Sequence, residues 1–158
     1  MDPVVHFEMP YDDPSRVAKF YQAAFGWKMK MMGEQMGHYV LAATGETSAD
    51  GMIKKPGMIN GGFFPKKPEW PAQPSVVLQV KDIRKAMDKV ANAGGKVLGD
   101  PMPIPGIGDY VSFTDTEGNR VGMLEPVPMK KVAAKKPAAK KKLAAGKRPA
   151  KKKASRKR

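Results

Sequence analysis

The chain has 158 residues, about the length of one domain, and a formal net charge of +14. It contains no cysteine, which excludes disulfides, thiolate metal sites and a cysteine nucleophile. It has no apolar run long enough to span a bilayer and no segment of the secretory type at its N-terminus, so we expect a cytoplasmic protein without a membrane span.

The positive charge is concentrated at the C-terminal end. Residues 130–158 hold 15 of the 29 Lys and Arg and no Asp or Glu, which leaves 14 basic and 15 acidic side chains in residues 1–129. The sequence therefore predicts a nearly neutral domain over 1–129, followed by a separate cationic segment. Such an asymmetry indicates a polyanionic partner.

The first half of the domain has the pattern of a strand, a helix and three further strands. A short apolar run begins at Val4. Asp13, followed by proline, is a typical N-cap, and the helix that it begins is expected to end at Gly26. Strands should follow over 27–32, 38–43 and 58–65.

The second half repeats this order at an offset of 69 residues, after a linker over 65–74 that contains four prolines. Asp82 should cap a helix that ends at Gly94 and Gly95, followed by strands over 96–99, 109–115 and 120–126. The segment 101–108 is predicted to be a loop, either a plain connector or a cover for a ligand. The order βαβββ thus occurs twice, and the alternative is a generic α+β sandwich whose two helices are alike by chance.

Several short stretches occur in an order and at a spacing typical of one family. They are His6-Phe7-Glu8-Met9-Pro10, Phe20-Tyr21 with Phe25-Gly26-Trp27, Gly61-Gly62-Phe63-Phe64-Pro65, Gly94-Gly95-Lys96-Val97, and the run from Asp115 to Gly122. Together they resemble the vicinal oxygen chelate superfamily, which includes glyoxalase I, bleomycin-resistance proteins and extradiol dioxygenases. The resemblance implies an α+β fold in which two tandem modules, about 1–66 and 74–129, form a cup-shaped mixed sheet with the site in its concavity.

Enzymes of this family usually hold a divalent metal with His or Glu from the first and last strands of each module. The resemblance places these four positions at His6, Gly62, Ser75 and Gly122. Only His6 is retained as a ligand, because serine binds divalent ions poorly and glycine has no side chain. We therefore expect no cofactor and no divalent metal. The alternative is a metal-dependent lyase or dioxygenase that uses His6 with other ligands.

Without a metal, His6 is the candidate catalytic residue, since an imidazole can exchange protons near neutral pH. It could equally be a polar residue whose hydrogen bonds are satisfied at the start of a strand. Glu8, two residues further on, should share the strand face of His6, whereas Glu125 should lie on the face opposite Gly122. The candidates that we expect to line the cup are Glu8, Phe63, Ser75, Tyr110 and Gly122.

Residues 130–158 consist mainly of Lys, Ala, Arg and Pro, too few apolar side chains for a core, so we expect a disordered tail. Its composition resembles the C-terminal tails of linker histones and of bacterial histone-like proteins. Lysine neutralises phosphates without reading base edges, so the tail should bind DNA with little sequence specificity and associate the protein with the nucleoid. RNA, anionic lipid or no dedicated partner are the alternatives. The residues expected to contact nucleic acid are Lys135, Lys136, Lys140, Lys141, Lys142, Lys147, Arg148, Lys151, Lys152, Lys153, Arg156, Lys157 and Arg158.

Three functional hypotheses follow from the sequence. The first is a glyoxalase-like domain that binds an unknown small molecule in its cup, or carries out a lyase-type reaction there without a metal, joined to a tail that binds nucleic acid. The second is the metal-dependent enzyme described above. The third is a DNA-associated structural protein in which the fold serves for packing or for homodimerisation.

Overall fold

The computed structural model describes residues 1–48, 53–68 and 72–127, all within the compact unit Met1–Pro128. The predicted basic tail and its expected nucleic-acid contacts lie outside the described residues. None of the helices that the structure describes has both the length and the apolar character needed to cross a membrane.

The predicted order βαβββ is confirmed in both modules. The first module consists of β1 (Val4–Tyr11), α1 (Pro14–Phe25), β2 (Lys28–Met31), the short 3₁₀ helix η1 (Glu34–Met36), β3 (Val40–Ala43) and β4 (Asn60–Pro65). The second consists of β5 (Ser75–Gln79), α2 (Ile83–Asn92), β6 (Lys96–Ile104), β7 (Gly108–Thr114) and β8 (Arg120–Pro126).

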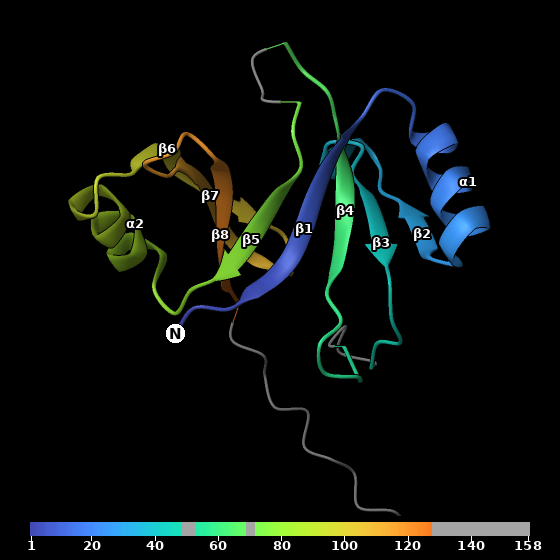
Figure 1. Ribbon diagram of the computed structural model, residues 1–158, viewed down its shortest axis with the longest axis horizontal. Helices are drawn as coiled ribbons and strands as arrows, with labels where there is room; N and C mark the ends of the chain where they lie inside the picture. Colours follow the sequence, from blue (N-terminus) through green and yellow to red (C-terminus); the bar gives the residue numbers. More distant parts are fainter. Residues whose placement is uncertain (49–52, 69–71, 128–158) are drawn as a thin grey trace, which may run out of the picture. The chain divides into compact units, whose positions relative to one another are not determined.

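All eight strands belong to one mixed sheet, in the order β2-β3-β4-β1-β5-β8-β7-β6. Within the modules, β1 pairs with β4 and β5 with β8 in parallel, while the other pairs are antiparallel. The two first strands, β1 and β5, lie next to each other in antiparallel orientation and join the modules (Figure 1). The predicted α+β class with a mixed sheet is therefore confirmed.

Both helices begin at the predicted aspartates. The Asp13 carboxylate accepts hydrogen bonds from the backbone N–H groups of Ser15 and Arg16, at 2.8 and 2.9 Å. The Asp82 carboxylate accepts one from the backbone N–H of Lys85 at 3.0 Å. These bonds satisfy N–H groups that have no partner inside a first helical turn.

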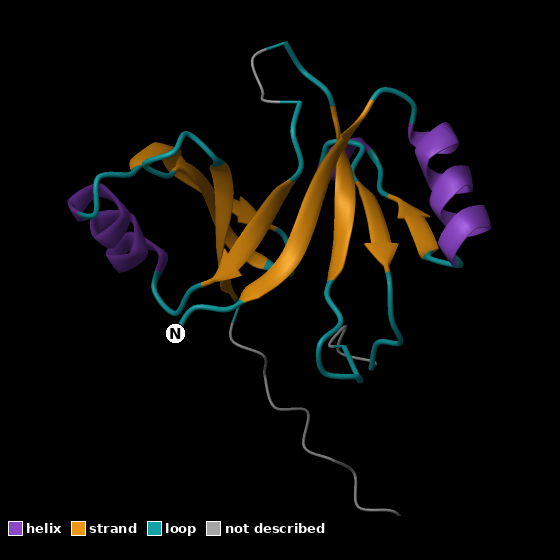
Figure 2. Ribbon diagram, viewed as in Figure 1, coloured by secondary structure: helices purple, strands orange, loops and turns teal. Residues whose placement is uncertain are grey.

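The two helices lie on the outer face of the sheet (Figure 2), and buried apolar side chains pack beneath them. Under α1, the core of the first module includes Tyr11, Val40 and Phe63, and the core beside α2 in the second module includes Val111 and Met123. Successive side chains on a strand point to opposite faces. The residues that alternate with these core residues therefore face the side of the sheet without helices.

The segment 101–108 differs from the predicted loop. Strand β6 continues through it as far as Ile104 and pairs with β7, with a register shift between Leu98 and Met102. Pro101 and Pro103 do not prevent this, because β6 lies at the edge of the sheet, where a residue without a backbone N–H removes no essential hydrogen bond. Only the short turn between β6 and β7 remains a connector.

Candidate functional site

A cavity of about 600 Å³ opens on the face of the sheet without helices and is lined by both modules. Much of the lining is apolar and comes from the segment around η1, from β3 and β4, and from β6 with the turn after it. Polar side chains come mainly from β1, β5, β7 and β8 and from the residue before β3; they include His6, Glu8, Tyr39, Ser75, Tyr110 and Arg120. A mostly apolar concavity with a few converging polar groups is typical of a small-molecule site.

His6 and Tyr39 form a neutral hydrogen-bonded pair in this cavity. The imidazole Nε2 lies 2.9 Å from the Tyr39 hydroxyl. Burial lowers the pKa of His6 to about 4, so the ring is uncharged at neutral pH. Burial, and then the charge of Glu8, raise the pKa of Tyr39, which keeps the phenol protonated. The tautomer of His6 decides which of the two groups donates the hydrogen bond.

A second set of hydrogen bonds leads from a guanidinium to a carboxylate. Arg120 Nη2 donates to Ser112 Oγ at 3.1 Å, Ser112 Oγ donates to the Tyr110 hydroxyl at 3.2 Å, and the Tyr110 hydroxyl donates to Glu8 Oε2 at 2.9 Å. Burial raises the pKa of Glu8, while the hydrogen bond from Tyr110, the charge of Arg120 and a hydrogen bond from Ser75 act in the opposite direction. Glu8 is thus a carboxylate withdrawn from water but held by donors, the environment that gives a general base a usable pKa.

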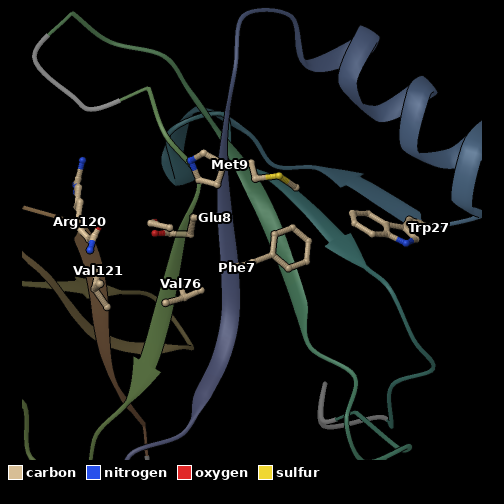
Figure 3. A pocket seen from close by; sticks show the side chains of 10 residues that line it. Phe7, Glu8, Met9, Trp27, Val76, Arg120 and Val121 are labelled. Carbon is tan, nitrogen blue, oxygen red and sulfur yellow. The ribbon is translucent and has the colours of Figure 1, made fainter. Parts of the chain in front are cut away.

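Three of these polar residues lie in a row across the junction of the modules. Glu8 on β1 pairs directly with Ser75 on β5. Strands β5 and β8 are parallel, and Val77 pairs with Gly122. Two residues earlier on each strand, Ser75 and Arg120 therefore lie at the same level. Figure 3 shows Glu8 pointing from β1 towards the side of β8 and Arg120.

A more open hollow of about 420 Å³ lies at the same junction. Its lining includes Phe7, Trp27 and Val121, and it shares Glu8 and Arg120 with the larger cavity. In Figure 3, Phe7 and Trp27 lie on the other side of β1 from Glu8. The polar row therefore separates an apolar hollow from the cavity.

Two glycines lie beneath the rings of the two cavity tyrosines. A Cβ atom at Gly62 would collide with the ring of Tyr39. A Cβ atom at Gly122 would lie 2.7 Å from Cε2 and 2.8 Å from the hydroxyl of Tyr110, closer than real Cβ contacts. Each ring therefore occupies the space that a side chain on the neighbouring strand would need.

The same arrangement occurs in both modules. Gly62 pairs with Leu41, two residues after Tyr39. Gly122 pairs with Ser112, two residues after Tyr110. In each module the tyrosine lies on the next-to-last strand or directly before it, and its ring reaches diagonally over to cover a glycine on the last strand. Such diagonal neighbours are within reach of an aromatic side chain.

The residues present do not fit a divalent metal held in the family pattern. Gly62 and Gly122 are the positions that the resemblance assigns to ligands from the last strands, and tyrosine rings fill the space above both. Ser75, at the third position, donates a hydrogen bond to Glu8. In residues 1–48, 53–68 and 72–127, no three side chains of His, Cys, Asp or Glu come close enough together to hold a metal ion.

The structure brings three of the expected cup residues, Glu8, Ser75 and Tyr110, together in the cavity with His6, the candidate catalytic residue. Phe63 does not join them. Its side chain is 1% exposed in the core beneath α1, and the next residue, Phe64, lines the cavity instead, because neighbouring side chains on a strand alternate. Gly122 lies under the Tyr110 ring.

From the sequence, Tyr39 was one of several aromatic residues that could line the cup but were expected mostly to pack in the core, and Ser112 and Arg120 were not singled out as site residues. A signal for Tyr39 did exist, because Tyr39 and Tyr110 are 71 positions apart, close to the module offset of 69. Ser112 and Arg120 gave no comparable signal, since a serine in a strand and an arginine after a turn are ordinary surface residues.

The close contact between Gly122 and Tyr110 predicts coupled substitutions. Gly122→Ala should lower the free energy of unfolding by about 1–3 kcal/mol through overpacking. In a Tyr110→Ala background the same change should cost little, whereas in a Tyr110→Phe background, which keeps the ring, it should cost as much as in the wild type. Urea unfolding of the set measures this coupling. The coupling would be contradicted if Gly122→Ala had the same effect in the Tyr110→Ala background as in the wild type, to within about 0.5 kcal/mol.

The buried imidazole predicts a loss of stability in acid. As the pH falls below about 6.5, His6 takes up a proton in the unfolded chain, whereas in the folded chain it does so only near pH 4. Protonation therefore favours the unfolded state, and the free energy of unfolding should fall by up to about 3 kcal/mol between these two pH values. The raised pKa of Glu8 acts with the opposite sign, because protonation relieves its buried charge. His6→Gln should therefore flatten the decline of stability between pH 7 and pH 4. Urea unfolding across this range tests it, and identical declines in both proteins would contradict the assignment.

Comparisons with known proteins agree with the fold. A model of the Glyoxalase/Bleomycin resistance protein/Dioxygenase superfamily matches residues 4–123. CFP32 of Mycobacterium bovis, whose name carries the word glyoxylase, is 27% identical over 124 residues, and the match covers 78% of this chain but only 44% of that protein. The chain therefore spans less than half the length of this relative. A glyoxylase-like domain-containing protein of Didymella fabae is 32% identical over 118 residues, which cover 71% of this chain and 84% of that protein.

Solved structures with a similar fold include methylmalonyl-CoA epimerases. The enzyme from Mycobacterium tuberculosis has a TM-score of 0.56 and 13% identity, with 79% of this chain and 88% of that chain covered. A methylmalonyl-CoA epimerase in complex with methylmalonyl-CoA and NH4+ has a TM-score of 0.59 and 14% identity, with 80% and 96% covered. At such identities the likeness concerns the fold alone. Because the family model covers most of its length, the chain belongs to the glyoxalase/bleomycin resistance protein/dioxygenase superfamily.

Proposed function

We propose that the domain binds a small organic molecule in the cavity between its modules and does so without a metal ion. The proposal is supported by the tyrosine rings that fill the space above Gly62 and Gly122, two positions that the resemblance assigns to metal ligands, and by a cavity of the size and lining of a ligand site. A ligand would place its apolar body against β3, β4 and the end of β6, and its polar end among the side chains from β1, β5, β7 and β8.

The polar end of the cavity has groups that could move a proton. Glu8 is a partly desolvated carboxylate in contact with a phenol, and His6 is a neutral imidazole in contact with another. Such groups can accept a proton from a bound molecule and return it at another atom. This chemistry supports a metal-independent lyase-type or isomerising reaction as the active form of the proposal, with His6 and Glu8 as its candidate catalytic residues.

The cavity itself can be tested with a neutral apolar probe. N-phenyl-1-naphthylamine should bind the full-length protein with an increase in fluorescence, because the cavity removes it from water. Leu41→Trp puts a larger side chain into the cavity and should weaken binding at least about tenfold. Addition of a chelator should leave binding unchanged.

Leu98→Trp is the matched control, since Leu98 is 40% exposed on β6 and does not line the cavity. Equal binding by both tryptophan variants would place the probe elsewhere on the protein and argue against the cavity. Loss of binding on chelation, with recovery on addition of a divalent metal, would favour the metal-dependent alternative that uses His6.

For the tail we propose non-specific binding to DNA, which associates the domain with the nucleoid. The proposal is supported by the segregation of charge, with 15 basic and no acidic residues in 130–158 beside a nearly neutral domain. Cations that neutralise phosphates release counterions, and the resulting affinity depends on charge density and salt rather than on base sequence.

Binding of the full-length chain to duplex DNA across a salt series tests the tail. Lys→Gln substitutions at 140–142 and 151–153 should make the slope of log K against log salt shallower by up to about 5, at about 0.9 per lost phosphate contact. The matched control replaces six exposed lysines of the domain, namely Lys19, Lys28, Lys30, Lys81, Lys89 and Lys96. If both sets change the slope equally, the tail has no special part in binding.

A further inference from the structure

The chain has sulfur only in thioether side chains. It contains 12 methionines and no cysteine. A cysteine reacts with peroxides through its thiolate, whereas a methionine is converted to its sulfoxide by the transfer of one oxygen atom. Methionine is therefore the residue type at which a peroxide would change the sulfur chemistry of this protein.

Three of the methionines line the cavity, namely Met32, Met36 and Met102. Met32 directly follows β2 and Met36 ends η1, whereas Met102 lies on β6 in the other module. The backbone N–H of Met32 donates to the carbonyl of Tyr39 at 2.8 Å, and the carbonyl of Met36 accepts from the N–H of Tyr39 at 3.2 Å. The cavity wall beside Tyr39 is thus held between two methionines.

The cavity methionines are open to solvent, unlike methionine in the core. Met102 is 58% exposed, and Met32 and Met36 are only partly buried. Met123, by contrast, is 2% exposed in the core beside α2. Because a reagent dissolved in water reaches exposed sulfur atoms first, a peroxide should oxidise the methionines of the cavity before that of the core.

Oxidation would change the character of the cavity wall. A methionine side chain is flexible and apolar, and it adapts to the shape of a bound molecule. A sulfoxide is polar, and its oxygen must lose hydration when an apolar ligand covers it. Each oxidised side chain therefore removes apolar contact area and adds a cost of desolvation at the same place.

We propose that Met32, Met36 and Met102 form a reversible oxidation site, at which hydrogen peroxide switches off the binding of apolar ligands. The O–O bond of the peroxide breaks, one oxygen atom bonds to the methionine sulfur, which is oxidised, and the other oxygen leaves as water. A dithiol acting through a methionine sulfoxide reductase restores the thioether, with loss of water and formation of a disulfide in the reductant. The inference rests on the proposed function of the cavity and adds a means of regulating it.

Probe binding before and after oxidation tests the site. Full-length protein is treated with hydrogen peroxide, the peroxide is removed with catalase, and N-phenyl-1-naphthylamine is titrated while mass spectrometry of peptides locates the added oxygen atoms. The affinity should fall about tenfold as the three cavity methionines are oxidised. Methionine sulfoxide reductases A and B with dithiothreitol should restore it. Unchanged affinity in protein that carries all three sulfoxides, or resistance of the three methionines to peroxide in the folded protein, would overturn the inference.

Leucine variants assign the effect to these residues. The triple variant Met32→Leu, Met36→Leu and Met102→Leu keeps apolar side chains of similar volume but has no sulfur at the three positions. Its affinity should be the same before and after peroxide, and this comparison removes any difference in starting affinity. Met31→Leu is the matched control, because Met31 is 49% exposed and does not line the cavity; it should lose affinity as the wild type does. A triple variant as sensitive to peroxide as the wild type would place the effect at other residues and contradict the assignment.

The outcomes separate this inference from the proposal on which it rests. Probe binding that survives oxidation of the cavity methionines supports the cavity and overturns only the oxidation site. Absence of probe binding by the untreated protein overturns both. If the triple variant does not fold, partial oxidation of the wild type still decides the question, since affinity should fall with oxidation of the three cavity methionines and not with that of Met31.

Discussion

The antiparallel pairing of β1 with β5 is the contact on which the rest of the domain depends. Each module has a sheet of four strands and one helix, and neither sheet can enclose a cavity alone. The pairing makes one sheet of eight strands and places Glu8 against Ser75 at the junction. The cavity lining then includes residues from both modules, and the polar groups that could bind a ligand meet at the seam.

Successive side chains on the strands point to opposite faces of the sheet, so the residues that form the core differ from those that line the cavity. One set of side chains packs beneath the helices, and the other set lines the cavity. Glu125 shows how strict this separation is: it lies on the same strand as Arg120, but its carboxylate accepts the backbone N–H of Ile83 at the start of α2, at 2.8 Å. An acidic residue near the ligand positions in sequence therefore stabilises a helix end on the opposite face.

The architecture could be read from the sequence because its signals are local and occur twice. Caps at Asp13 and Asp82, helical spacing and turn glycines specify each element, and the repeat specifies the topology. The position of Glu125 followed from strand periodicity alone. The burial of Phe63 in the core and the length of β6 could not be predicted in this way. The two phenylalanines at 63 and 64 give no hint of which faces the core, and prolines end a strand unless it lies at an edge.

The polar site was harder to foresee, because it depends on contacts between strands that are distant in sequence. Tyr110 meets Glu8 across 102 positions, and Tyr39 meets His6 across 33. Such pairs depend on register and on ring direction, which a single sequence does not encode locally. The glycines at the positions that the resemblance assigns to ligands were visible in the sequence, but the tyrosine rings that cover them were not.

The tyrosine that covers each glycine also limits how this chain could change over time. A side chain at Gly62 or Gly122 would collide with the tyrosine ring above it unless that ring moved. The tyrosine would have to move or become smaller, at the expense of its hydrogen bond to β1 and of the packing of its ring. Substitutions at the glycine and at the tyrosine are therefore coupled in both modules, so that neither position can change its size independently of the other.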